Sequence, residues 1–359
     1  MSTKSGVEWT RTIHADGTFT PGTTWSPVTG CTKKSEGCRN CWAKHEVETR
    51  WSKNPNSVFF GRPFSDVRCH PEQLQQPIRQ RKGRRIFVCP RGDLFHEEVP
   101  FEFIAAVFGA MAVASHHTFL VLTKRPERML AFFDWLDHEA NRVPGSAGPA
   151  SLCYTKLLAI GVELPTRAGD IDPAAIAWPL PNVQLGVSVE NQPAADERIP
   201  LLLKAPAAVR WLSLEPLLGA VDLELLDCMG GLHRKIDWVI AGGESTSDAR
   251  PMHPEWVRDL QDQCHHARVP FFFKQWGEWL PITEMPDAGE SLYEPVPKNE
   301  PDDATRRCKV DTRVIAYDGG EHWNASAGYP SCLTFKVGKR AAGHQLDGQV
   351  YHQFPRSIQ

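Results

Sequence analysis

Three cysteines near the start of the chain are the residues best suited to chemistry. Cys31, Cys38 and Cys41 form a C-x6-C-x2-C pattern within the stretch WSPVTGCTKKSEGCRNCWAKHEVETRW. Thiolates this close in sequence can converge on one metal or redox centre. Gly30 and Gly37 let the intervening loop turn tightly. The pattern therefore indicates a metal-binding loop with these three cysteines as ligands.

Three chemistries are compatible with this loop, and they differ in the number of ligands that they need. A [4Fe–4S] cluster held by three cysteines leaves one iron open for a small molecule, and the spacing favours this interpretation. A structural zinc ion needs a fourth ligand, which His45 could supply. A dithiol redox pair would use only Cys38 and Cys41, and three buried cysteines without metal are the remaining alternative.

The elements that must position the loop follow from the pattern of apolar residues. A helix is expected over Trp42–Trp51, which places Cys41 at a helix start, where backbone amides favour a thiolate. Further along, short apolar runs alternate with helical segments, as in a parallel sheet covered on both faces. Strands are expected just before Trp25 and at Arg85–Val88, Thr118–Leu122, Val183–Val187, Arg210–Leu214, Trp238–Ala241 and Pro270–Phe273, and helices at Phe101–Ala114, Pro126–Leu136, Pro193–Leu203 and Pro254–His266.

Seven strands in series favour an α/β fold of the TIM-type (β/α) barrel kind, complete or partial. No G-x-G-x-x-G follows any of these strands, which disfavours an open dinucleotide-binding sheet. We expect the barrel and its N-terminal cysteine loop to span residues 1–280, with an inserted segment at about 139–181. Residues 281–359 would then form a C-terminal extension that packs on the barrel.

Composition narrows the class of protein. The 359 residues are 41% hydrophobic and 23% charged, with a formal net charge of −3. This net charge argues against a general electrostatic attraction of the whole protein to nucleic acid or membrane, but it leaves room for a local basic groove. No apolar run approaches the ~20 residues of a membrane span, and the first residues lack a secretory signal. We therefore expect a cytoplasmic protein, in which ten cysteines indicate metal or redox chemistry rather than disulfides.

Polar residues follow the expected strands, at the barrel end where active sites form. Asp93, Ser188, Glu190, Glu215 and Glu244 are candidates to contact the amine or ribose of a cofactor, with turn capping and structural ion pairs as the alternatives. Gly242 and Gly243 would let a ligand approach the backbone, or they simply form a tight turn. Lys124 and Arg125 suit a carboxylate or phosphate, with a solvated loop pair as the alternative. Lys274 beside Trp276 suits a nucleotide, with a capping lysine beside a buried tryptophan as the alternative.

Other reactive residues have weaker signals. Cys89 ends the second expected strand, where a thiol facing the cavity could donate hydrogen to a substrate radical, although a buried cysteine is the commoner outcome. The histidines His96, His253 and the pair His265–His266 are expected on the surface or behind the ligands. The basic run Arg79–Arg85 could contact phosphate, but such runs more often lie on a solvated surface.

Several segments together resemble a known family. The cysteine loop, read with RIFVCPRGDLFHEEVP, TFLVLTKRPERM, LGVSVENQPAADERIP, WLSLEPLLG, WVIAGGES and FFFKQWGEW, looks like a phage- and bacterium-encoded family of three-cysteine-motif proteins. That family is similar to radical S-adenosylmethionine (SAM) enzymes and more distantly to spore photoproduct lyase. The resemblance covers about residues 8–280 and 334–355.

The resemblance implies a radical-SAM-type (β/α) barrel with an iron–sulfur cluster in the loop after the first strand. Cys31, Cys38 and Cys41 would hold three irons of a [4Fe–4S] cluster, and S-adenosyl-L-methionine would bind the fourth. Its reductive cleavage would give a 5′-deoxyadenosyl radical that abstracts hydrogen from a nucleic-acid or nucleotide-type substrate. The first cysteine gap is six residues rather than the usual three, and Asn40 replaces the usual aromatic residue, so Trp42 is expected to cover the adenine instead.

Two other classes of function remain open. A zinc- or cluster-stabilised binding protein would work with a protein partner and perform no chemistry. A dithiol redox protein would use Cys38 and Cys41. The polar strand ends favour an enzyme, which would also need an electron donor, and no membrane association is expected.

Overall fold

A single parallel sheet forms the centre of the molecule. The computed structural model describes residues 6–14, 16–165, 171–223, 236–287, 289–292, 308–320 and 331–355. Seven strands pair in the order β11-β10-β9-β8-β7-β6-β3, and every neighbouring pair is parallel. Their bounds are β3 Thr23–Trp25, β6 Arg85–Val88, β7 Thr118–Thr123, β8 Val183–Ser188, β9 Val209–Leu214, β10 Trp238–Gly242 and β11 Phe271–Gln275.

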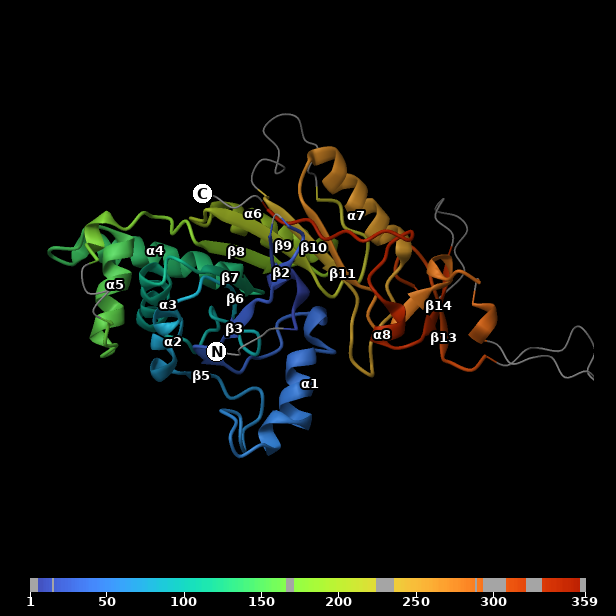
Figure 1. Cartoon of the computed structure of the whole chain (residues 1–359), viewed down its shortest axis with the longest axis horizontal. Coiled ribbons are helices and arrows are strands. Elements are labelled where there is room, and N and C mark those ends of the chain that lie inside the picture. The colour runs from blue at the N-terminus through green and yellow to red at the C-terminus, as the bar shows by residue number, and fades with distance from the viewer. Residues whose placement is uncertain are drawn as a thin grey trace, which may run out of the picture.

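Helices between consecutive strands cover the outer face of this sheet (Figure 1). They are α2 Gln75–Arg79, α3 Phe101–Val113, α4 Pro126–Arg142, α5 Pro149–Ala159, α6 Gln192–Lys204 and α7 Pro254–Ala267. The sheet curls into a half-barrel whose edges, among the described strands, are β3 and β11. The expected α/β class and all seven expected strands are confirmed, and the partial form of a TIM-like barrel is the one observed.

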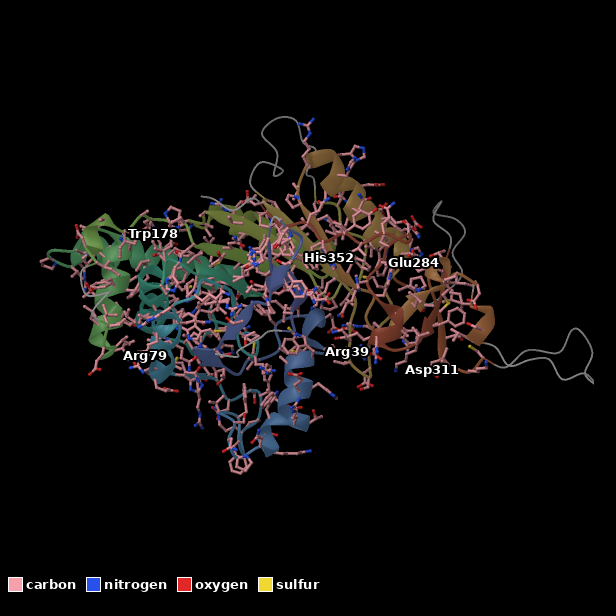
Figure 2. All side chains as sticks on the ribbon, viewed as in Figure 1. Arg39, Arg79, Trp178, Glu284, Asp311 and His352 are labelled. Carbon is pink, nitrogen blue, oxygen red and sulfur yellow. The ribbon has the colours of Figure 1, made fainter. Side chains whose placement is uncertain are left out.

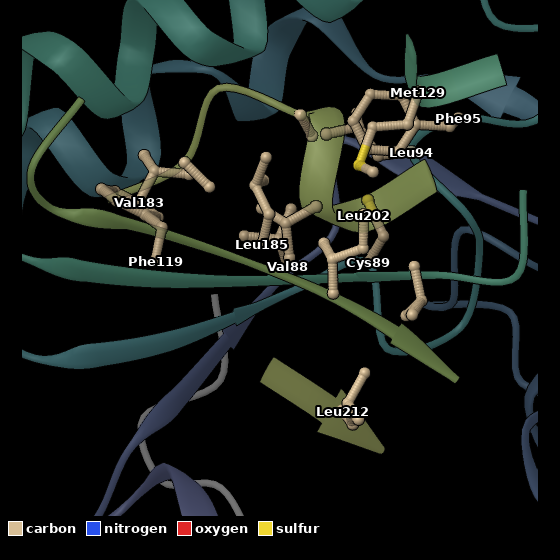
Figure 3. Packing of buried hydrophobic residues seen from close by; sticks show 14 of the residues in the cluster. Val88, Cys89, Leu94, Phe95, Phe119, Met129, Val183, Leu185, Leu202 and Leu212 are labelled. Atoms are coloured by element: carbon tan, nitrogen blue, oxygen red, sulfur yellow. The ribbon is translucent and has the colours of Figure 1, made fainter. Parts of the chain in front are cut away.

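The two faces of the sheet have different partners because successive side chains of a strand point to opposite sides. Outward residues such as Val88, Leu185 and Leu212 pack with the helices in the main core, which Figure 3 shows from close by. Inward residues form a separate aromatic cluster that includes Trp211 and Trp238. The N-terminal segment covers this inner face, since Trp9 lies 5.3 Å from Trp211 between ring centroids.

The segment inserted between β7 and β8 contains a helix that the sequence pattern does not reveal. Helix α5 packs closely on α3, where a Cβ added to Gly109 would overlap the carbonyl oxygen of Cys153. Gly109 therefore permits a backbone approach that no other residue would allow. The expected insertion is in this way part of the helical layer.

A second unit projects from the body in the stretch of chain between β3 and β6. Helix α1 (Trp42–Thr49) and the loop after it hang below the body in Figure 1. A short antiparallel pair of strands, β4 (Val28–Thr29) and β5 (Arg68–Cys69), closes the base of this unit. The strands β1 (Thr12–Ile13) and β2 (Phe19–Thr20) form a separate small hairpin.

The C-terminal part adds an antiparallel sheet and a return segment. The sheet has the order β12-β14-β13, and its elements are β12 Trp279–Pro281, β13 Thr312–Ile315 and β14 Cys332–Lys336, followed by helix α8 Lys339–Ala342. The return segment, residues 343–355, runs beside β11, where the Phe273 amide donates to the Tyr351 carbonyl over 2.8 Å. In the described ranges, no helix is both long enough and apolar enough to cross a membrane.

Candidate functional site

Polar side chains gather on the inner face of the half-barrel, at the carboxyl ends of the strands. Trp211 and Trp238 belong to the inner aromatic cluster, so alternation also puts Ser213, Gly242 and the following Glu215 on this face. Ser188 pairs with Ser213, and Lys274 lies two residues after Phe272 of the same cluster, so both also lie on this face. Glu190 and Glu244 follow β8 and β10 at the same end of the sheet. The strand-end residues that the sequence singled out therefore come from four neighbouring strands to one region.

The cysteine loop is attached to this end of the sheet. Gly30 bridges to Gly92 after β6, and the Gly30 amide donates to the Arg91 carbonyl over 2.9 Å. Gly30 has a φ of +89°, and a Cβ there would overlap the carbonyl oxygen of Asp66, so the position requires glycine. Cys31 follows directly, while Cys41 is the residue before the first turn of α1. The expected helix start at Cys41 is confirmed.

Arg125 is the main anchor of Cys31, although it is nearly inaccessible at 2% exposure. Its Nη1 donates to Cys31 Sγ over 3.5 Å and to Asp93 Oδ2 over 3.3 Å. Its Nη2 donates to the hydroxyl of Thr32 over 2.9 Å, and its Nε donates to Glu97 Oε2 over 2.9 Å. One buried guanidinium thus ties the first cysteine to the ends of β6 and β7.

Asp93 is fully occupied by protein groups. Its carboxylate accepts from the Thr123 hydroxyl over 2.8 Å, from the Phe95 amide over 3.0 Å and from the Lys124 amide over 3.3 Å, besides Arg125. With both oxygens engaged, the carboxylate holds Arg125 and the end of β7 in place. Of the two roles expected for Asp93, contact with a cofactor and a structural role at a turn, these contacts favour the structural role.

His96 supports the same anchor from behind the first cysteine, which is one of the two positions expected for it, and it does not lie on the surface. Only 2% of its surface is exposed. Its Nδ1 accepts from the Glu98 amide over 3.2 Å, so Nε2 carries the proton and donates to the Thr32 hydroxyl over 2.8 Å. Burial and the charge of Arg125 lower the pKa of His96, which keeps the ring neutral. His253 is likewise buried, whereas His265 and His266 are exposed.

Glu190 lies directly under the cysteine loop. A Cβ on Gly37 would lie 3.0 Å from Glu190 Cδ. Burial opposes ionisation of Glu190, but Lys124, whose Nζ lies 3.8 Å away, and Arg198, whose Nη1 donates over 2.8 Å, hold its pKa below the ordinary value. The carboxylate is therefore an ionised support for the loop.

A second tie joins the loop to the end of β10. Asn40 Nδ2 donates to Glu244 Oε2 over 2.8 Å, and Arg250 binds the same carboxylate through Nη2 over 2.5 Å. Arg250 Nη2 also donates to the Glu36 carbonyl over 3.0 Å. We call Asn40, Glu244 and Arg250 the clasp, and it explains why a polar residue precedes the last cysteine.

Glu215 and Lys274 form an ion pair that spans β10. Lys274 Nζ lies 2.8 Å from Glu215 Oε1, although their strands β11 and β9 are separated by β10. The pair fits because Gly242, on the strand between them, has no side chain, and a Cβ there would lie 2.9 Å from Glu215 Oε1. At Gly243, a Cβ would instead overlap the carbonyl oxygen of Trp276, so this glycine makes room for the protein's own backbone.

Cys89 and Trp42 have contrasting environments. Cys89 packs in the main hydrophobic core, as Figure 3 shows. Only 4% of its surface is exposed, and burial raises the pKa of its thiol well above the ordinary value. Trp42 is 40% exposed, and the Arg91 guanidinium lies 5.8 Å from its ring centroid. Cys89 is thus a core residue, while Trp42 faces outward beside the loop.

The three cysteines of the loop lie close enough to influence one another's ionisation. Cys31, Cys38 and Cys41 are free and partly exposed, and Cys38 is close enough to raise the pKa values of both other thiols. Burial, with Asp93, raises the pKa of Cys31 to about 12 despite Arg125. Backbone amides of Lys44 and Ala43 oppose the effect of burial at Cys41. Within the described residues, no three His, Cys, Asp or Glu side chains already form a metal-binding group.

The fold and site together define a class: an α/β half-barrel whose carboxyl edge is covered by a loop with three cysteines. The chain belongs to the family described as protein of unknown function (DUF5131), whose family model matches residues 4–355. No curated protein and no solved structure shows significant similarity to it.

Proposed function

We propose that the chain is a radical-SAM-like iron–sulfur enzyme. Cys31, Cys38 and Cys41 would hold three irons of a [4Fe–4S] cluster, and the amino and carboxylate groups of S-adenosyl-L-methionine would occupy the fourth. When bound, the cluster would pass one electron from an external donor to SAM, whose S–C5′ bond breaks to give methionine and a 5′-deoxyadenosyl radical. The observation that carries the proposal is the attachment of three partly exposed thiols to the carboxyl edge of a parallel half-barrel.

The protein's own residues divide into two groups. Asp93, Glu190 and Glu244 are paired with arginines, so we assign them to positioning the loop. The inner-face residues Ser188 and Glu215 remain to contact the cofactor's amine or ribose, with Lys274 orienting Glu215. This division narrows the five acidic or hydroxyl residues that were candidates for cofactor contacts.

The substrate that we propose is of the nucleic-acid or nucleotide type, as the family resemblance implies. A cytoplasmic location is part of the proposal, and the free thiols of the described cysteines support it because a reducing compartment keeps thiols unpaired. The buried Cys89 is an unsuitable hydrogen donor unless the core opens, because its thiol lies among apolar side chains.

Metal analysis tests the proposal. Anaerobically purified protein is expected to be brown and to carry about four irons and four sulfides per chain. The single variants Cys31→Ala, Cys38→Ala and Cys41→Ala should each lose the visible absorption, whereas Cys69→Ala, a free cysteine outside the loop, should keep it. A colourless protein with one tightly bound zinc would overturn the proposal in favour of a zinc-stabilised binding protein.

Product analysis separates cluster binding from catalysis. With dithionite and SAM, the reconstituted wild-type chain is expected to release 5′-deoxyadenosine, and Glu215→Gln should raise the SAM concentration needed for half-maximal release. A brown protein that releases no 5′-deoxyadenosine under these conditions would remove the radical-SAM assignment. Reversible oxidation of Cys38 and Cys41 to a disulfide in a metal-free protein would point instead to dithiol redox chemistry.

A further inference from the structure

The projecting unit around α1 has its own small core and an unusual surface. We call residues 31–68 the α1 prominence; it comprises the cysteine loop, α1, the 3-10 turn Trp51–Lys53 and the loop that returns to β5. Figure 1 shows it extending away from the sheet. Ala43, Val47, Phe59 and Phe64 pack inside it. Trp51 packs against this core, whereas the exposed Trp42 and Phe60 are not part of it.

The prominence is basic, although the whole chain is slightly acidic at −3. Its lysines and arginines outnumber its acidic residues eight to four, and most of them are exposed. The basic residues are Lys33, Lys34, Arg39, Lys44, Arg50, Lys53, Arg62 and Arg68, against Glu36, Glu46, Glu48 and Asp66. Figure 2 labels Arg39 where the prominence meets the body. Such a local basic surface attracts phosphate.

Guanidinium groups lie against two rings of this surface, the exposed Trp42 and the half-buried Trp51. Arg91 lies 5.8 Å from the Trp42 ring centroid and 5.0 Å from the Trp51 centroid, and Arg50 lies 4.9 Å from the Trp51 centroid. Trp42 is 40% exposed, and Phe60, on the return loop, is 53% exposed. Rings with open faces beside cations are what proteins use to stack unpaired bases while binding the backbone.

We propose that the α1 prominence binds single-stranded nucleic acid, with bases stacked on Trp42 and Phe60 and phosphates on the surrounding lysines and arginines. Trp42 directly follows Cys41, so a strand stacked there leads to the cysteine loop. Bases in a duplex are not available for stacking, which favours a single strand. The inference deepens the proposed function and rests on it for the chemical fate of the strand. It also reassigns Trp42 from the adenine of the cofactor to the substrate.

Binding of labelled oligonucleotides to the full chain tests this surface directly. Fluorescence anisotropy should show that a mixed-sequence single strand of ~15 nucleotides binds more tightly than the corresponding duplex, with an affinity that falls as salt rises. Trp42→Ala and Phe60→Ala should each weaken binding by about ten-fold, the value expected for one lost base stack. The double variant Arg39→Ala/Lys53→Ala should reduce the salt slope by ~1.4 for two lost phosphate contacts.

Matched controls lie elsewhere on the chain. Phe19 is 50% exposed and is stacked with Arg11, so Phe19→Ala removes a similar ring outside the prominence. Arg142, which is 71% exposed, serves as the basic control. Equal losses in the controls, equal affinity for single strand and duplex, or binding to anionic vesicles with no binding to the oligonucleotide would each overturn the inference.

Failure of the inference and failure of the proposed function are distinguishable. A chain that releases 5′-deoxyadenosine from SAM but does not bind the oligonucleotide contradicts only the α1 prominence as a nucleic-acid surface. A chain that binds the single strand through Trp42 and Phe60 but carries no iron keeps the surface and loses the radical-SAM proposal. Trp42→Phe should restore most of the binding lost in Trp42→Ala, since a ring can still stack.

Discussion

At the scale of single residues, Arg125 is the side chain on which the cysteine loop depends most. Arg125→Gln leaves Asp93 buried without its cation, and we expect a loss of about 3 kcal/mol in the free energy of unfolding. Because Arg125 lowers the pKa of Cys31 through its charge and its hydrogen bond, the variant holds less thiolate, and iodoacetamide should alkylate Cys31 more slowly in the metal-free variant. Urea unfolding and mass spectrometry of the labelled peptide measure the two effects.

Arg142→Gln is the control for this experiment, because Arg142 is exposed and far from the loop in sequence. It should leave both the unfolding free energy and the alkylation rate close to those of the wild type. An unchanged alkylation rate in Arg125→Gln would contradict the role of Arg125 as the anchor of Cys31.

Gly242 carries a second prediction at this scale. Gly242→Ala would place a methyl group against Glu215 and separate it from Lys274. We expect a loss of about 1–2 kcal/mol in stability, and a higher SAM concentration for half-maximal release of 5′-deoxyadenosine. Gly219→Ala, whose Cβ would meet only an ordinary contact at 3.6 Å, should change neither quantity. Normal stability and kinetics in Gly242→Ala would show that the ion pair tolerates the methyl group.

The strand-end residues can be predicted from the sequence because position after an apolar run fixes the sheet edge, and alternation fixes the face. The charged partners of these residues cannot be predicted in this way. Arg198 lies within α6 and Arg250 in a loop, and only the packing of those segments shows that they neutralise Glu190 and Glu244. The contact of His96 with Thr32, 64 residues away, escapes sequence reasoning for the same reason.

At the scale of elements, the strands are predictable because each is a short, continuously apolar run that helices cover. Helix α5 is not predictable, since it lies in a segment rich in proline, glycine and alanine and lacks a clear apolar stripe; it is helical through packing on α3. The small sheet β12-β14-β13 also escapes prediction, because its strands are separated by long stretches of sequence. The half-barrel's curl has no local signature either.

The contact between α3 and α5 makes the element-scale prediction. Gly109→Ala raises the intrinsic helix propensity of α3 by about 1 kcal/mol, yet its methyl group would overlap the Cys153 carbonyl. We expect a net loss of about 1–3 kcal/mol in the free energy of unfolding, measured by urea denaturation. Gly6→Ala, where no atom lies within 4 Å of the new Cβ, is the control. A stabilised Gly109→Ala protein would mean that the two helices separate at little cost.

At the scale of the whole molecule, stability should fall in mild acid. Burial and the neighbouring His116 lower the pKa of His117 to about 4, while the unfolded chain has its ordinary value of 6.5. Unfolding therefore takes up a proton between about pH 6.5 and 4, and the fold loses stability as the pH falls through that range. The ring is neutral because Nδ1 accepts from the Arg84 amide and Nε2 donates to the Pro77 carbonyl.

Comparison with His117→Gln isolates this contribution from the other histidines. The difference in unfolding free energy between wild type and variant should shift by about 2 kcal/mol from pH 7 to pH 4.5, in the direction that favours the variant in acid. His116→Gln, which removes an exposed ring beside it, should reproduce little of this shift. Parallel curves of unfolding free energy against pH for wild type and His117→Gln would contradict the assignment of this pH dependence to His117.

The return segment that lies beside β11 has a consequence for how the molecule behaves in a crowded solution. A half-barrel that does not close leaves two unpaired strand edges, and such edges act as templates on which other chains can add strands and aggregate. Residues 343–355 occupy one of them, and the backbone groups of Phe271 and Phe273 are satisfied by Gln353 and Tyr351. The opposite edge, β3, is only three residues long. The carboxyl end of the sheet can thus stay open, while the two side edges of the sheet offer few unpaired backbone groups to other chains.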